Sequence, residues 1–159
     1  MAIDNDKVIS TLNDLIETCK DGQEGFKQVA EGIKDSSIKN LFLQYSQQRA
    51  QFAGELQNEV NHLGGNPEHS GSVAGALHRG WMNIKSAVTG KDEHAILSEA
   101  ERSEDTSVSS YREALEKSLP ANIADLVRRQ YMAIQEAHDR VKSLRNATDV
   151  SSKATSTKV

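Results

Sequence analysis

Charged side chains interrupt the apolar stripes of two predicted helices near their midpoints. Arg49 falls among the core positions of one helix, and Glu101 and Glu104 fall among those of another. Positions that alternate at spacings of four and three residues share one helix face, so these charges are expected inside the protein. A buried charge is strongly unfavourable unless it is paired or bound to a metal ion. The residue types therefore predict either a buried salt bridge or what remains of a metal site.

Four helices carry such stripes. Residues 6–34 contribute Val8, Leu12, Leu15, Cys19, Gly22, Phe26, Val29 and Ile33. Residues 36–63 contribute Ile38, Phe42, Tyr45, Arg49, Phe52, Leu56, Glu59 and Leu63. Residues 92–117 contribute Leu97, Glu101, Glu104, Val108, Tyr111 and Leu115. Residues 120–146 contribute Ile123, Val127, Gln130 or Tyr131, Ile134, His138, Val141, and Leu144 or Arg145.

Capping and breaking residues set the boundaries of these helices. Asp35 and the two serines after it separate the first two helices, and so short a connection predicts an antiparallel hairpin. Two glycines followed by Asn66 and Pro67 end the second helix. Asp92 caps the third helix, and Pro120 stands in the first turn of the fourth. A second hairpin is therefore expected after residue 92.

A long connection joins the two hairpins. Residues 64–76 are rich in Gly, Ser, Asn and His and predict a crossover loop, and residues 73–88 predict a short helix that Trp81 packs against the bundle. This connectivity predicts an all-α, ferritin-like four-helix bundle over residues 1–147. Residues 148–159 have no apolar period and are expected to form a disordered tail.

Composition excludes several classes of protein. The chain has 159 residues, a net charge of -4 and only 4% aromatic residues, so it offers no basic or stacking surface for nucleic acid. Cys19 is the only cysteine, which excludes a disulfide within the chain and a multi-cysteine zinc site.

No run is long and apolar enough to span a membrane, and residues 1–6 lack the features of a secretion signal. Neither a nucleophile elbow nor a phosphate-binding glycine loop is present. A cytoplasmic protein is expected.

Several short motifs resemble known helical bundles. The chain is similar to an uncharacterised bacterial four-helix family within the ferritin-like superfamily, and more distantly to bacterioferritins. The resemblance to the uncharacterised family covers residues 3–147. It rests on four motifs: Asp21-Gly22-x-x-Gly25-Phe26, Leu77-His78-Arg79-x-Trp81, Glu104-Asp105 and Ala137-His138-Asp139-Arg140. The resemblance to bacterioferritins rests on residues 8–15, 63–67, 112–115 and 135–139. The resemblance to bacterioferritins implies a ferritin-like fold. The uncharacterised family has no established activity that could be transferred to this chain.

The departures from the bacterioferritin pattern affect its metal ligands. Cys19 stands where the first helix would supply a glutamate, and Arg49 and Phe52 stand where the second would supply a glutamate and a histidine. Only Glu104 and His138 keep their ligand types, while Gln135 replaces a glutamate. Because arginine cannot lose its proton to become a ligand, an oxygen-activating di-iron site is not expected.

Two hypotheses follow for the centre of the bundle. In the first, Arg49 pairs with Glu104 in a buried polar network completed by Glu101, Gln135 and His138, and no cofactor is bound. In the second, Glu101, Glu104 and His138 form a reduced site for iron or manganese. Cys19 is expected to be a buried structural thiol under either hypothesis.

The first hypothesis predicts a non-enzymatic protein. Such a protein would act as a homo-oligomer, for example a dimer, or through another protein partner, with a role under stress as one possibility. The second predicts a metal-binding protein or an oxidase. A pure assembly module is a third alternative.

Overall fold

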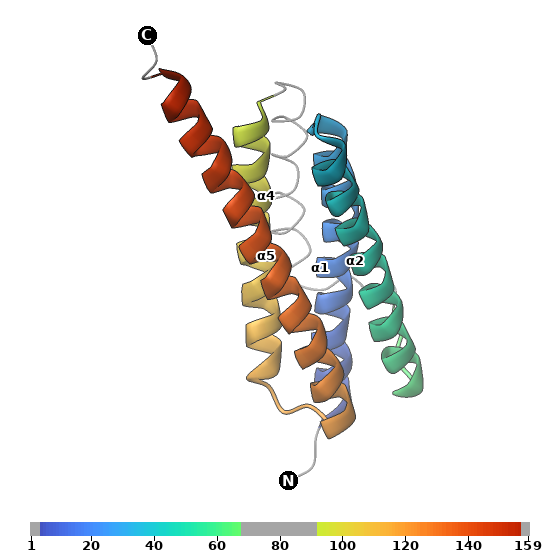
Figure 1. Cartoon of the computed structure of the whole chain (residues 1–159). Coiled ribbons are helices and arrows are strands. Elements are labelled where there is room, and N and C mark those ends of the chain that lie inside the picture. Colours follow the sequence, from blue (N-terminus) through green and yellow to red (C-terminus); the bar gives the residue numbers. More distant parts are fainter. Residues whose placement is uncertain (1–3, 68–91, 157–159) are drawn as a thin grey trace.

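The computed structural model describes residues 4–67 and 92–156, with side chains through residue 148. Four helices account for most of these residues: α1 (Asn5–Gly32), α2 (Ser36–His62), α4 (Glu93–Leu115) and α5 (Ala121–Ser156). Helices α1 and α5 run in one direction and α2 and α4 in the other (Figure 1). The predicted all-α four-helix bundle is therefore confirmed. The short crossover helix predicted at residues 73–88 lies outside the described part of the chain.

Aspartates cap three of the four helices, and two of these caps, Asp35 and Asp92, are at the predicted places. Asp4 accepts a hydrogen bond from the backbone N–H of Asp6, Asp35 from those of Ser37 and Ile38, and Asp92 from that of Ala95. These carboxylates satisfy N–H groups that have no partner within the helix. The Asp35 cap lets α2 begin with only three residues between it and the end of α1, which makes the first hairpin tight.

Glycine ends α2 because the chain must leave the helix beside α1. Gly64 has a φ of 79°, a conformation that favours glycine, and the backbone N–H of Gly65 donates to the carbonyl of Val60 at 2.9 Å. A Cβ at Gly65 would lie only 2.8 Å from a side-chain atom of Ile9. The two glycines therefore provide both the turn and the close approach to α1.

The connection between the two hairpins joins opposite ends of the bundle. The amide of Asn13, near the start of α1, donates to the carbonyl of Asn66 just after α2. At the other end, the backbone N–H of Lys34 donates to Glu93 at the start of α4. Helices α2 and α4 are consequently parallel, as the predicted crossover requires. Within the described residues, no helix is long and apolar enough to cross a membrane.

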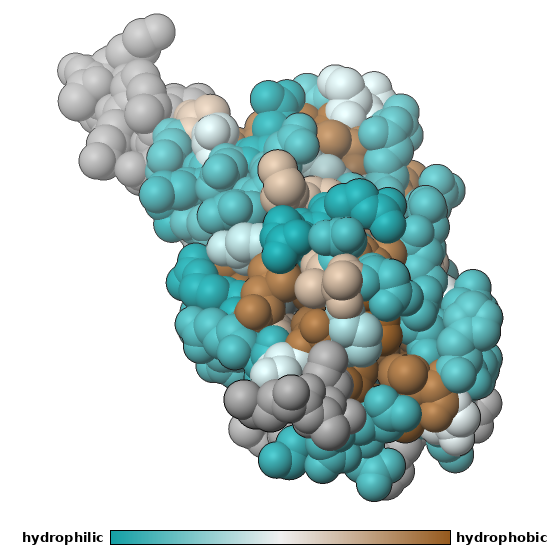
Figure 2. Space-filling view, turned by 90° about the horizontal axis from the view of Figure 1, so that it is seen from below, coloured by the Kyte–Doolittle hydropathy of each residue, from teal (hydrophilic) through white to brown (hydrophobic). Residues whose placement is uncertain are grey.

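The hydrophobic core consists of two clusters stacked along the bundle. Viewed along the helices, hydrophobic residues fill the centre and hydrophilic ones surround them (Figure 2). One cluster includes Leu12, Cys19 and Tyr111 near the start of α1, and the other includes Phe26 and Phe42 near its end. Gly22 lies between the two clusters on α1. On α2, Arg49 lies between Ala53 of the first cluster and Phe42 of the second. A polar layer therefore separates two apolar ones.

Helix α5 is longer than predicted. The sequence predicts its end near residue 146 and a disordered tail from residue 148, but the helix continues to Ser156, beyond the ends of the other helices (Figure 1). Its sequence after Pro120 contains neither glycine nor proline, so nothing in the backbone forces it to stop. The lack of an apolar period therefore does not exclude a helix here.

Candidate functional site

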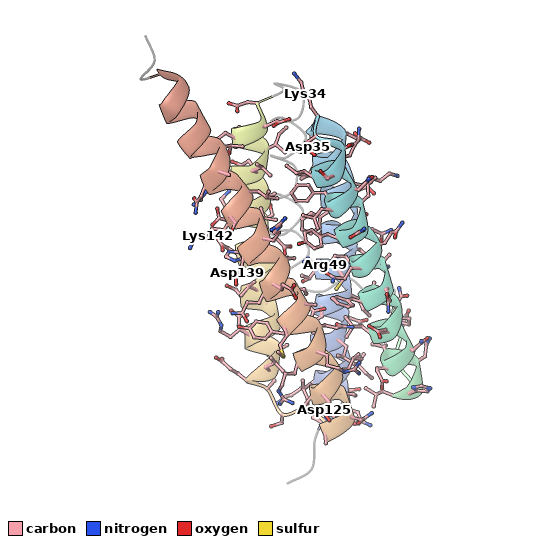
Figure 3. The ribbon with its side chains drawn as sticks, viewed as in Figure 1. Lys34, Asp35, Arg49, Asp125, Asp139 and Lys142 are labelled. Atoms are coloured by element: carbon pink, nitrogen blue, oxygen red, sulfur yellow. The ribbon has the colours of Figure 1, made fainter. Side chains whose placement is uncertain are left out.

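The polar layer is built on an ion pair between α2 and α4. Arg49 points from α2 into the bundle (Figure 3), where its Nη1 and Nη2 each donate to one oxygen of Glu104 at 2.7 Å. Both side chains are 0% exposed. Two parallel hydrogen bonds between a guanidinium and a carboxylate are the strongest geometry that this pair can adopt. The pair thus ties one hairpin to the other at the middle of the core.

Two residues of α1 complete the surroundings of Arg49. Its Cζ atom lies 5.0 Å from the centre of the Phe26 ring, a distance at which the ring face attracts a cation. Gly22 leaves the space that the guanidinium occupies, because a Cβ there would lie 3.3 Å from Nη1. Burial acts to lower the pKa of Arg49, but the charge and hydrogen bonds of Glu104 outweigh it and raise that pKa. The arginine therefore remains a cation in the core.

A second chain of hydrogen bonds lies beside the ion pair. The hydroxyl of Tyr111 donates to Oε1 of Gln130 at 2.7 Å, and the amide of Gln130 donates to the carbonyl of Phe52 and to Glu55. Sγ of Cys19 lies 3.1 Å from the same tyrosine hydroxyl. These contacts connect the core to the partly exposed Glu55. They satisfy Gln130, which is otherwise buried among apolar residues.

Burial keeps the Cys19 thiol and the Tyr111 hydroxyl in their protonated forms. It raises the pKa of the Cys19 thiol to about 11, although the hydrogen bond with Tyr111 opposes the shift. It likewise raises the pKa of Tyr111 well above its ordinary value, and the neighbouring Cys19 adds to the effect. A thiol reacts as its thiolate, so Cys19 has the properties of a structural residue.

The structure does not bring the remaining predicted residues into the polar layer. Gln135 is exposed, because it follows the buried Ile134 and lies about 100° away from the apolar stripe of α5. Gln130 is the buried glutamine instead, and its place on the apolar stripe was the signal that could have identified it. Glu101 is buried, but it pairs with Arg145 of α5.

His138 lies at the seam between α4 and α5 and not beside Glu104. Its Nε2 is 2.5 Å from Asp105, and its Nδ1 is 3.1 Å from Asp139, which points outward (Figure 3). Asp105 directly follows Glu104, so the two carboxylates face different neighbours, α5 and the core respectively. The prediction that His138 completes the Arg49 network is therefore wrong.

The three residues proposed as metal ligands each pair with a different partner. Arg145 pairs with Glu101, Arg49 with Glu104, and Asp105 with His138. Among the described residues, no group of three His, Cys, Asp or Glu side chains could hold one metal ion. The geometry gives the mid-bundle layer the chemistry of a buried ion pair.

The His138 contacts predict a pH-dependent contribution to stability. Burial acts to lower the pKa of His138, but hydrogen bonds to Asp139 and Asp105 and their charges outweigh it and raise the pKa above 6.5. A raised pKa in the folded state stabilises the protein below the unfolded value, and this contribution is lost as the pH rises through the folded value. Urea unfolding of the wild type and of His138→Gln between about pH 5.5 and 8.5 should show their stabilities converging with rising pH. A difference independent of pH would contradict this.

Comparison with known proteins identifies one family. The sequence model of a family described as a domain of unknown function (DUF2383) matches residues 7–117. The match includes Cys19, Arg49, Glu104 and Tyr111 and ends before α5, which carries Gln130 and His138. No curated protein matches the chain.

Proposed function

We propose that this chain, which belongs to the DUF2383 family of unknown function, is a non-enzymatic helical-bundle protein that acts through assembly or through a protein partner. The proposal rests on the Arg49–Glu104 pair, which is fully buried between two apolar clusters. A guanidinium at this place engages both oxygens of Glu104 and adds a positive charge that repels a metal cation. The layer thus supplies a fixed structural link.

The connectivity of the helices supports a ferritin-like origin for this arrangement. In ferritin-like metal proteins the ligands lie at the middle of the bundle, on facing helices. Arg49 and Glu104 lie between the two apolar clusters. We infer that a cation of the protein itself has replaced the charge of a metal, and that the bundle needs no cofactor. The single buried thiol of Cys19 suits a reducing, cytoplasmic setting.

Elemental analysis tests this proposal against its main alternative, a reduced iron or manganese site. The untagged protein would be prepared from cells grown with added iron and manganese. We expect metal well below about a tenth of an equivalent per chain, because the carboxylate and imidazole groups have other partners. About one equivalent of metal per chain, lost on His138→Ala and retained in the matched surface variant His62→Ala, would overturn the proposal.

A further inference from the structure

The outermost stripe of α2 consists of carboxamide side chains. Five amides follow one another at helical spacing on the exposed face, with Gly54 completing the pattern: Asn40, Gln44, Gln47, Gln51 and Asn58. Each of the five is exposed, and the helix lies at the edge of the bundle (Figure 1). Spacings of four and three residues keep these positions on one face. The surface that α2 presents to its surroundings is therefore polar but nearly free of charge.

This lack of charge distinguishes α2 from the other helices. Lys39 is the only charged residue among the exposed positions of α2, and the next charge along the helix that is not buried is Glu55. The exposed faces of α1, α4 and α5 instead carry acidic and basic residues along their length. Charged residues are the usual choice for a surface that meets only water, and their depletion is typical of the core of a protein interface.

A groove adjoins this face where α2 and α5 diverge. One cavity of about 480 Å³ is lined by Gln44, Gln47, Gln48, Gln51, Phe52 and Glu55 from α2 and by Leu126, Arg129, Gln130 and Ala133 from α5. Among the residues that the structure describes, two large hydrophobic side chains are exposed: Leu43 on α2, at 38%, and Met132 on α5, at 64%. Phe52, Leu126 and Ala133 are the apolar residues of its lining. The amide face thus continues into a recess that is partly apolar.

A second copy of this chain fits such a surface better than a charged partner. Around a two-fold axis each residue lies close to its own copy, so a charged residue there would face a like charge. A carboxamide both donates and accepts hydrogen bonds, and therefore complements itself. A charge-free stripe of amides meets this requirement over the whole stretch between Lys39 and Glu55.

The area available is consistent with a weak dimer. A helix of 27 residues is about 40 Å long and about 10 Å wide, so α2 alone would bury about 400 Å² per chain. Specific interfaces bury at least about 600 Å² per partner. The adjoining groove supplies additional surface, which places the contact at the small end of this range.

We propose that the amide face of α2, with the adjoining α2–α5 groove, is the interface of an antiparallel homodimer of this chain. Gln47 lies midway between Lys39 and Glu55, close to the two-fold axis. This inference rests on the proposed function, since it names the partner of a protein that acts through assembly. Metal content and dimerisation are measured separately, so either proposal can fail alone.

Sedimentation of charge variants tests the interface. In Gln47→Glu/Gln51→Glu, like charges would face each other across the axis, and we expect the dissociation constant of the dimer to rise at least about tenfold. The control Gln23→Glu/Gln135→Glu adds the same charge at exposed positions of α1 and α5 and should dimerise as the wild type does. Added salt should partly restore dimerisation of the first variant alone.

A cross-linking experiment locates the axis. Gln47→Cys should form a disulfide-linked dimer under mild oxidation, and Gln135→Cys should not. The native Cys19 does not compete, because it is fully buried. A wild type that stays monomeric up to about 1 mM would overturn the proposal and assign the face to a different protein. A dimer unaffected by Gln47→Glu/Gln51→Glu would overturn it by placing the interface elsewhere.

Discussion

Replacing Arg49 with methionine should lower the free energy of unfolding by about 3–5 kcal/mol. The substitution leaves Glu104 0% exposed and without the guanidinium that engages both of its oxygens. A buried carboxylate in that state must either stay charged without compensation or take up a proton. Glu104→Gln should cost a similar amount, because it leaves the cation of Arg49 unpaired. Urea unfolding followed by circular dichroism measures both.

The double variant Arg49→Met/Glu104→Leu separates the ion pair from the packing. Removing both charges together also removes the unpaired partner, so most of the stability lost in each single variant should return. Arg128→Met provides a surface control, since Arg128 pairs with Asp125 but both side chains are more than half exposed. It should change stability by less than about 0.5 kcal/mol.

The expected pattern is specific enough to fail. If Arg49→Met costs less than about 0.5 kcal/mol, the guanidinium is not an essential part of the core. If the double variant is as unstable as the sum of the single variants, the two residues act independently. Either result would remove the observation on which the proposed function depends.

Gly22→Leu should destabilise the protein by about 3 kcal/mol or more. Even a Cβ at this position would lie 3.3 Å from Nη1 and 3.4 Å from Cγ of Arg49. A larger side chain can fit only if the guanidinium moves, and the two hydrogen bonds to Glu104 hold it in place. The variant therefore either strains α1 against α2 or breaks the ion pair.

Gly54→Leu is the matched control for this substitution. Gly54 also lies within a helix, but a Cβ there would meet nothing within 4 Å. Leucine favours the helix more than glycine does, so the control should leave stability unchanged or raise it by about 0.5–1 kcal/mol. Both variants would be unfolded in urea at low protein concentration. Equal effects at the two positions would show that Gly22 has no special relation to Arg49.

The fold was predictable because strong local signals agreed. The apolar stripes, the aspartate caps and the Gly64-Gly65 end of α2 all specify helices and their boundaries within a few residues. The charges on the stripes also indicated a buried polar layer, because burial without a partner is unfavourable. Arg49 and Glu104 are that pair in the structure.

The partners of the other polar residues were harder to predict. A stripe fixes the face of a residue only to within about one helical position, or 100°, and Gln135 lies one position beyond Ile134 of the stripe. His138 does lie near the stripe, yet Asp105 and Asp139 offer it hydrogen bonds at the α4–α5 seam. Which carboxylate a side chain reaches depends on the relative rotation of neighbouring helices, and a single sequence does not encode that directly.

The division of the ion pair between the two hairpins has a consequence for folding kinetics. Each hairpin can form from contacts between neighbouring segments while its charge, Arg49 or Glu104, is still hydrated. The charges lose water together only when the hairpins dock, and a slip of one turn, about 5.4 Å, would bury both without a partner. The pair therefore makes misaligned docking of the two hairpins energetically unfavourable. Since it forms late, its loss should appear mainly as faster unfolding in denaturant-jump experiments, with little change in the folding rate.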